Sequence, residues 1–140
     1  MARAKAAVPA KLLTEVELEL MNILWRLGGG TVNEVLAELP SERPLAYTSV
    51  STILRILEQK EVLASEKVGR GHRYLPRVAK RAYEAFALSH LMGKVFDGQP
   101  VELVRRLVDT GGLSAEELAS LRRLLEENRA GNRGGNRGRL

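Results

Sequence analysis

Residues 46–60, AYTSVSTILRILEQK, present two different faces when they are arranged as a helix. One face is apolar, recurs at i, i+3, i+4 and i+7, and consists of Val50, Ile53, Leu54 and Leu57. The opposite face carries hydroxyl groups, one base and no carboxylate, and consists of Thr48, Ser51, Thr52 and Arg55. Such a face can approach phosphates without repulsion and can form hydrogen bonds with base edges. The pattern favours a surface that reads DNA, with a solvated face that lacks glutamate as the alternative.

The segment before this stretch predicts two further helices. Thr14 and Glu17 have the spacing of a capping box, which starts a helix, and a run of three glycines then stops that helix. Thr31 and Glu34 repeat the spacing and start a short second helix, which Pro40 ends. A short helix, a turn and the two-faced helix therefore follow one another. This is the order of a helix-turn-helix motif, whose second helix lies in the major groove.

The segment after residue 60 predicts a β-hairpin. Residues 62–68 and 72–75 are typical of short strands, and Gly69-Arg70-Gly71 between them is typical of a turn. A basic hairpin directly after a recognition helix is a wing, which contacts the DNA backbone or the minor groove. The alternative is a surface hairpin whose arginines bind nothing. The side chains predicted to bind DNA are Thr48, Ser49, Ser51, Thr52 and Arg55 of the helix and Lys67, Arg70 and Arg73 of the hairpin.

Charge is sorted along the chain, which has 140 residues and a net charge of +5. Residues 67–81 hold six lysines and arginines and no acid, whereas residues 14–39 hold five glutamates and one arginine. This sorting predicts a polyanionic partner that is bound by one surface.

Several function classes are excluded by what the sequence lacks. There is no cysteine, and neither His72 nor His90 has a histidine or carboxylate at i+3 or i+4 with which to bind a metal. No Gly-x-Ser-x-Gly elbow or convergent acid–base set is present. No apolar run approaches the roughly 20 residues of a membrane span. We therefore expect a cytoplasmic protein that is not an enzyme, binds no cofactor and does not insert into a membrane.

The C-terminal half predicts helices with more apolar surface than they can bury. Residues 79–96 form a helix that is apolar on more than one side, and short amphipathic helices follow at 101–108 and from residue 114. A symmetric interface between two chains would cover this surface, and folding back onto the N-terminal part is the alternative. The side chains predicted to form the dimer interface are Tyr83, Phe86, Leu88, Met92, Leu118, Leu121 and Leu125.

These elements predict a mainly α protein with a small β-hairpin. A winged helix-turn-helix domain occupies residues 13–78, and a helical dimerisation domain follows at residues 79–129. A basic flexible arm at residues 1–12 precedes them. Residues 130–140, rich in Gly, Asn and Arg, predict a disordered tail that either adds sequence-independent affinity for nucleic acid or keeps the protein in solution.

Five motifs in a fixed order carry a family resemblance. They are Glu17-x-x-x-Met21-x-Ile23-Leu24-Trp25, Thr31-x-x-Glu34-Val35, Leu45-Ala46-Tyr47-Thr48-Ser49-Val50-x-Thr52-x-Leu54, Gly69-Arg70 with Tyr74-x-Pro76, and Leu113-Ser114-x-x-Glu117-Leu118. From about residue 13 to 127 the chain resembles the penicillinase-repressor family of the BlaI/MecI type. The resemblance implies a winged-helix repressor that dimerises through its C-terminal helices and binds a palindromic DNA operator. It also implies derepression when a membrane sensor-peptidase triggers proteolytic cleavage.

The chain departs from the family pattern at three points. Ile56 stands where the family usually has an arginine, and the base of the recognition helix is Arg55 instead. The pair Arg106-Leu107 stands where antibiotic-responsive members carry the Asn-Phe bond that is cut. Because cysteine is absent, the chain cannot sense copper through the cysteine pairs of copper-responsive relatives.

Two other functions stay open on the sequence alone. A winged helix can bind an acidic protein partner, in which case DNA would produce no specific shift. The chain could also be a non-specific architectural DNA-binding protein, in which case every duplex would bind with comparable affinity.

Overall fold

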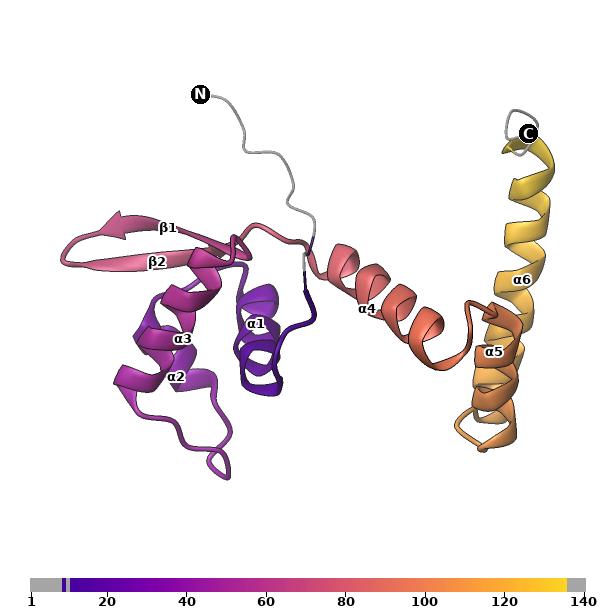
Figure 1. Ribbon diagram of the computed structural model, residues 1–140, viewed down its shortest axis with the longest axis horizontal. Coiled ribbons are helices and arrows are strands. Elements are labelled where there is room, and N and C mark those ends of the chain that lie inside the picture. Colours follow the sequence, from indigo (N-terminus) through magenta and orange to yellow (C-terminus); the bar gives the residue numbers. More distant parts are fainter. Residues whose placement is uncertain (1–8, 10, 136–140) are drawn as a thin grey trace. The chain divides into compact units, whose positions relative to one another are not determined.

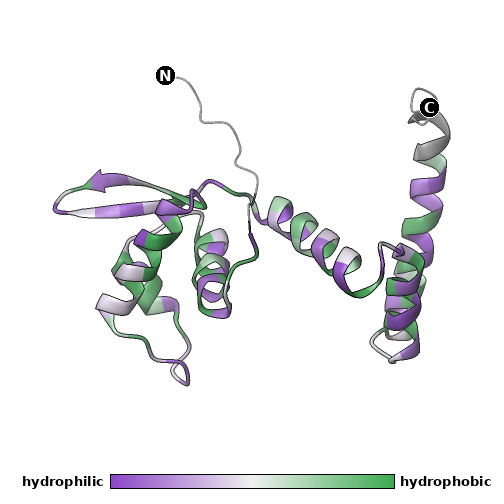
Figure 2. Ribbon diagram, viewed as in Figure 1, coloured by the Kyte–Doolittle hydropathy of each residue, from purple (hydrophilic) through white to green (hydrophobic). Residues whose placement is uncertain are grey.

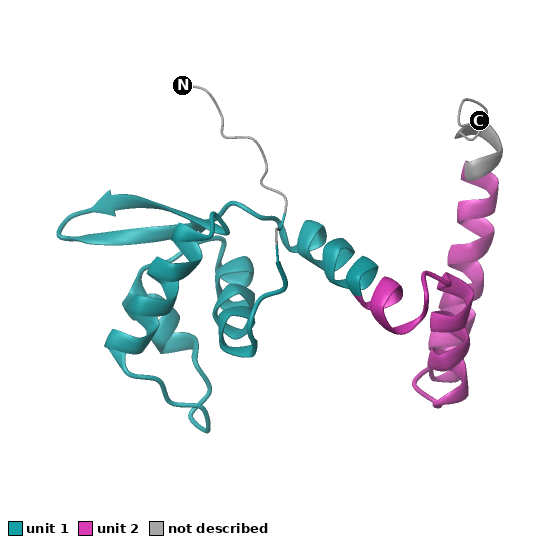
Figure 3. Ribbon diagram, viewed as in Figure 1, with its two compact units in different colours: residues 1–90 teal, residues 91–140 magenta. Residues whose placement is uncertain are grey.

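The computed structural model describes residue 9 and residues 11–135, with side chains as far as residue 131. Along the chain the elements are α1 (Glu15–Leu27), α2 (Val32–Glu38), α3 (Tyr47–Gln59), β1 (Leu63–Val68), β2 (Gly71–Pro76), α4 (Lys80–Val95), α5 (Pro100–Asp109) and α6 (Ala115–Gly135) (Figure 1). Two compact units, Met1–His90 and Leu91–Leu140, divide the chain within α4 (Figure 3). The predicted fold class, mainly α with one hairpin, is confirmed.

The predicted starts of α1 and α2 and the predicted end of α1 are confirmed by their caps. The Thr14 side chain accepts a hydrogen bond from the Glu17 amide, and the Glu17 carboxylate accepts one from the Thr14 amide. Thr31 and Glu34 form the same reciprocal pair at the start of α2. These bonds satisfy amides that have no partner inside the helix. Gly28 ends α1 with φ +81°, a conformation that glycine adopts without strain.

The core of the first unit fixes the orientation of α3. Val50, Leu54 and Leu57 of α3 are completely buried. They belong to a cluster that also contains Leu20, Met21, Ile23, Leu24, Val32, Val35, Val62, Leu63, Tyr74, Val78 and Tyr83. Because the apolar face of α3 packs on this cluster, its hydroxyl-bearing face is directed away from the core.

The hairpin is antiparallel and is joined to the end of α1. Its register runs from Leu63 opposite Pro76 to Val68 opposite Gly71. Gly30 and Tyr74 form an isolated bridge, in which each amide donates to the other residue's carbonyl at 2.9 and 2.8 Å. A Cβ on Gly29 would lie 2.6 Å from Leu75 Cδ2, so only glycine fits there without a shift. The sequence predicted the three glycines to be a helix stop only, whereas Gly29 and Gly30 also let the end of α1 approach the wing.

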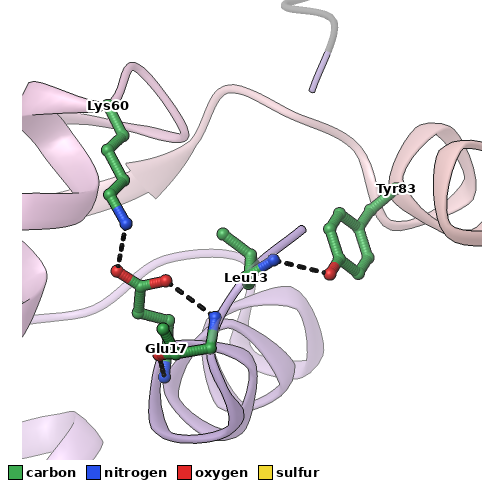
Figure 4. A network of polar contacts seen from close by, with 5 residues as sticks. Leu13, Glu17, Lys60 and Tyr83 are labelled. Atoms are coloured by element: carbon green, nitrogen blue, oxygen red, sulfur yellow. Dashed lines mark hydrogen bonds and ion pairs between the residues drawn. The ribbon is translucent and has the colours of Figure 1, made fainter. Parts of the chain in front are cut away.

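Tyr83 holds the start of α4 on the first unit. Its hydroxyl accepts a hydrogen bond of 2.9 Å from the Leu13 amide (Figure 4), and its ring centroid lies 5.9 Å from that of Trp25. Trp25 in turn donates to the Val78 carbonyl at 2.9 Å. Phe86 is half-buried against the same core. The ring and hydroxyl of Tyr83 are thus used within its own unit, and its place in a dimer interface stays a prediction.

Two predicted domain limits differ from the structure. The first unit continues to His90 rather than ending at residue 78, because the first turns of α4 pack on its core. Helix α6 continues to Gly135, although a disordered tail was predicted from residue 130. An existing helix gains one backbone hydrogen bond for each added residue, which offsets the low helix propensity of glycine. Residues 136–140 of the predicted tail, and residues 1–8 and 10 of the predicted arm, lie outside the described part.

The second unit leaves much of its apolar surface uncovered. Its helix α6 starts at the predicted third capping box, in which Ser114 and Glu117 exchange hydrogen bonds of 2.9 and 3.1 Å. No described residue of α5 is buried. Both helices carry hydrophobic as well as hydrophilic residues (Figure 2). The exposed large apolar side chains of this unit are Leu91, Val95, Val101, Val104, Leu107, Val108, Leu118, Leu124 and Leu125.

Glu17 is the one buried charged residue among those described, with 5% of its surface exposed. Lys60 at the end of α3 donates to its carboxylate at 2.7 Å, so the pair ties the start of α1 to the end of α3 (Figure 4). Burial by itself raises the pKa of the Glu17 carboxyl. The Lys60 ammonium and the hydrogen bond from the Thr14 amide outweigh burial, and together they hold the pKa below its ordinary value.

We expect the Glu17→Gln variant to lose part of the acid dependence of stability. With a folded-state pKa below the unfolded one, the Glu17 carboxylate stabilises the fold above the ordinary glutamate pKa of about 4.3. That contribution is lost as the pH falls through the lower pKa of the folded state. Urea unfolding at several pH values should show a cost of about 1–2 kcal/mol for the variant near pH 7 and a smaller cost as the pH falls below the ordinary glutamate pKa. An equal cost at all of these pH values would contradict the assignment.

Candidate nucleic-acid interface

The side chains predicted to bind DNA from α3 lie on the side of that helix opposite its buried face. Thr48, Ser49, Thr52 and Arg55 are exposed, and Ser51 is half-buried. They lie on the face that the core leaves free because Val50, Leu54 and Leu57 take the opposite face. The structure thus brings together the hydroxyl-bearing side chains that the helical spacing placed on one surface.

A groove of about 670 Å³ separates α3 from the hairpin. It is lined by Thr31, Val32, Asn33, Tyr47, Ser51, Arg55, Glu58, Ser65, Val68, Arg70, Gly71, His72 and Tyr74. Arg55 of the helix and Arg70 of the hairpin therefore stand around the same groove. Two guanidinium groups from different elements can contact one phosphate backbone at the same time.

A carboxylate at the end of α3 connects the helix to the wing. The Ser65 hydroxyl in β1 donates to Glu58 at 2.6 Å. Burial chiefly raises the pKa of Tyr74 in the groove wall, and the Glu58 charge raises it further, whereas Arg55 acts in the opposite direction. Glu58 makes the interior of the groove less attractive to phosphate.

The three basic residues predicted on the hairpin fall into two groups. Lys67 and Arg70 are exposed, and neither has an ion-pair partner within the described part of the chain. Arg73 is different, because it is half-buried and its Nη1 lies 3.5 Å from the Glu34 carboxylate, which also caps α2. DNA binding by Arg73 stays a prediction; Glu34 partly neutralises its charge, and the pair helps to hold the wing against α2.

The sequence interpretation missed three exposed polar or aromatic residues near this surface. Gln59 continues the stripe of Thr48, Thr52 and Arg55 by one more turn and is exposed. Tyr47, with 52% of its surface exposed, and Asn33 of α2 line the groove. Gln59 could have been predicted from the sequence, because it continues the helical spacing of Thr48, Thr52 and Arg55. Tyr47 and Asn33 had no sequence signal, because their place depends on how α2 and the wing pack.

The described residues contain neither a metal-binding cluster nor a membrane-spanning helix. Within residues 9 and 11–135, no three histidine or carboxylate side chains cluster in a way that would hold a metal ion. None of the described helices combines the length and the apolar character that crossing a bilayer requires.

Three helices followed directly by a hairpin that packs beside the third define a winged helix-turn-helix domain. The sequence model of the family described as penicillinase repressor matches residues 13–127. The chain belongs to this family, whose members are repressors rather than enzymes.

Two relatives and one solved structure illustrate the likeness. The penicillinase repressor of Bacillus licheniformis is 26% identical over 117 residues, covering 84% of this chain and 91% of that protein. Transcriptional regulator BlaI of Mycobacterium tuberculosis is 33% identical over 127 residues, covering 89% of each. The structure of Bacillus licheniformis BlaI as a monomer in complex with the blaP half-operator is 29% identical, with a TM-score of 0.45, and the match covers 52% of this chain and 89% of that one.

Proposed function

We propose that this protein is a sequence-specific DNA-binding repressor of transcription. The observation that carries the proposal is the exposed, hydroxyl-bearing face of α3 beside a hairpin with free basic side chains. Membership of a family of repressors supports it, as does similarity to a protein named as a transcriptional regulator.

In this proposal α3 lies in the major groove and its outer stripe reads the bases. Thr48 and Thr52 hold the centre of the stripe, where their hydroxyl groups form hydrogen bonds with base edges. Ser49 and Ser51 flank them. Arg55 binds either a guanine edge or a phosphate, since a guanidinium forms paired hydrogen bonds with both.

The wing supplies contacts that do not depend on sequence. Lys67 and Arg70 bind phosphates, and the wing is held in place by the Gly30–Tyr74 bridge and by Arg73 on Glu34. Phosphate contacts fix the register in which α3 meets the bases. Because the wing is anchored at two points, this register is set before DNA binds, which limits the ordering cost of binding.

We also propose that the protein acts as a homodimer on a palindromic operator. The support is the uncovered apolar surface of the second unit, which includes Leu118 and Leu125 of α6. In α4, Leu88 is exposed, and Met92 and Phe86 are half-buried. A two-fold dimer presents two copies of α3 to two half-sites related by the same symmetry. Leu121, half-buried, lies one turn before Leu125 on the same side of α6.

Release by proteolysis, triggered by a membrane sensor-peptidase, is part of the proposal because the family resemblance implies it. The corresponding pair, Arg106 and Leu107, is exposed inside α5, and Arg106 Nη1 lies 3.5 Å from Asp109. Proteases act on locally opened chain, so this turn of α5 has to unwind before a cut. A cut here separates α6 from the rest of the protein and would remove one side of the proposed dimer interface.

The operator can be found by selecting bound duplexes from a random DNA pool. We expect one sequence with two-fold symmetry to be enriched, and we refer to it below as the selected duplex. Enrichment of no sequence, with comparable affinity for all duplexes, would favour a non-specific architectural protein. Absence of any DNA shift would favour a protein-binding module.

We expect Thr52→Ala and Arg70→Ala to weaken binding in different ways. Thr52→Ala should lower the affinity for the selected duplex by about tenfold and leave a scrambled duplex nearly unchanged, because a base contact is worth about 1–3 kcal/mol. Arg70→Ala should weaken both duplexes alike and reduce the salt slope by about one, because one fewer phosphate is neutralised by the protein. Fluorescence titration at several salt concentrations measures both quantities.

The matched control for Arg70 is Arg26→Ala. Arg26 lies on α1, pairs with Glu38 at 3.0 Å and does not line the groove. Its replacement should change neither the affinity nor the salt slope. If Thr52→Ala weakened the selected and scrambled duplexes equally, base reading by this face of α3 would be ruled out.

A further inference from the structure

We propose that Ile56 reads the methyl group of a thymine, an inference that rests on the proposed DNA-binding function. The structure makes Ile56 the exception among the aliphatic residues of α3. Val50, Leu54 and Leu57 are fully buried and Ile53 packs against the core, whereas Ile56 keeps 38% of its surface exposed and is not part of that cluster.

Ile56 belongs to the DNA-facing side of the helix rather than to its buried side. It follows Thr52 by four residues, which places the two side chains next to each other on the surface of α3. Ser49 lies on the same flank, seven residues before Ile56. This flank does not line the groove beside the hairpin, whose residues from α3 are Tyr47, Ser51, Arg55 and Glu58.

A single exposed isoleucine is ordinary on a protein surface. The exposure of Ile56 matters for DNA binding, because docking of α3 into the major groove removes water from the side of the helix that carries Ile56. A phosphate or polar base edge opposite an isoleucine loses its water and gains no hydrogen bond. The apolar group that base pairs present in the major groove is the C5 methyl of thymine. Burial of Ile56 against that methyl therefore favours thymine over cytosine at one position of each half-site.

Replacing thymine with deoxyuridine tests this inference, since it removes the methyl and keeps every hydrogen-bonding group. Each thymine of the selected duplex is replaced in turn, together with its symmetry mate, and affinity is measured for the wild type. We expect one position to lose about fourfold in affinity for each half-site, the value of one buried methyl-sized group. Replacements elsewhere should have smaller effects.

The protein side of the test uses Ile56→Ala. This variant should bind the unmodified duplex about as weakly as the wild type binds the deoxyuridine duplex, and its affinity should fall no further when that methyl is removed. Ile56→Val keeps the branched side chain and should lose less affinity than Ile56→Ala, so it serves as the test variant if the alanine variant is poorly folded. Arg70→Ala, which changes a phosphate contact, should keep the full sensitivity to the methyl.

Two outcomes overturn the inference. In one, each deoxyuridine replacement lowers the affinity of the wild type and of both Ile56 variants by the same factor, which would mean that Ile56 contacts no thymine methyl. In the other, no thymine replacement weakens the wild type. Each of these leaves the preference for the selected duplex intact and so leaves the proposed function standing. A pool from which no sequence is enriched would instead contradict the proposed function itself.

Discussion

Leu125→Glu is expected to convert the protein into a monomer and to lower its affinity for the selected duplex by about 100-fold or more. A dimer binds its second half-site as an intramolecular event, and this gain of about 10²–10⁴ disappears when the two chains separate. Leu125 has 60% of its surface exposed in the single chain. The substitution should therefore leave the first unit folded while it places two charges in the proposed apolar interface.

The matched control is Ala119→Glu on the same helix. Ala119 lies on the polar side of α6 with Arg122, Arg123 and Glu126. The Ala119→Glu substitution should leave both the dimer and the affinity for the selected duplex unchanged. Sedimentation equilibrium at micromolar concentration, together with titration of the selected duplex, measures the two effects. A wild type that sediments as a monomer, or a Leu125→Glu variant that remains a dimer, would contradict the proposed interface.

Leu54→Ala is expected to lower the free energy of unfolding of the winged-helix unit by about 2–5 kcal/mol. Leu54 is completely buried where α3 meets the core, so its removal leaves a cavity that the surrounding helices fill only in part. Small domains are stable by about 5–15 kcal/mol, so the loss is a large fraction of the total. DNA binding should weaken as a consequence, because α3 is no longer held firmly.

Thr52→Ala is the control for this effect, two residues away on the opposite, exposed face. It should change stability by no more than about 0.5 kcal/mol, while it changes base preference as described above. Urea unfolding followed by circular dichroism gives both stabilities. Similar stability losses for Leu54→Ala and Thr52→Ala would mean that the two faces of α3 are not divided between core and surface.

Local patterns explain why much of the fold could be predicted from the sequence. Capping boxes act over three residues, and the apolar spacing of α3 acts over two turns, so both are visible in a single sequence. The hairpin was predicted because its turn glycines lie between short strands; Gly69, with φ +59°, is in the left-handed region. The apolar spacing of α3 also explains why its opposite face, which was predicted to read DNA, is exposed.

What the sequence could not show depends on contacts between distant residues. Tyr83 meets Leu13 across 70 positions, and Arg73 meets Glu34 across 39. Sequence patterns do not indicate which aromatic ring or arginine finds such a partner, so the contacts of Tyr83 and Arg73 within the first unit were not predicted. The contact of Gly29 with the wing was missed for the same reason, since a glycine run is typical of a helix end.

The ratio of affinities for the selected duplex and a scrambled duplex of equal length tests the central claim most directly. It should be measured with the unmodified protein at several salt concentrations that include about 150 mM. Base reading by α3 predicts a ratio of at least about 10³ at that concentration. A ratio near one at every salt concentration, with equal salt slopes for the two duplexes, would contradict sequence-specific recognition.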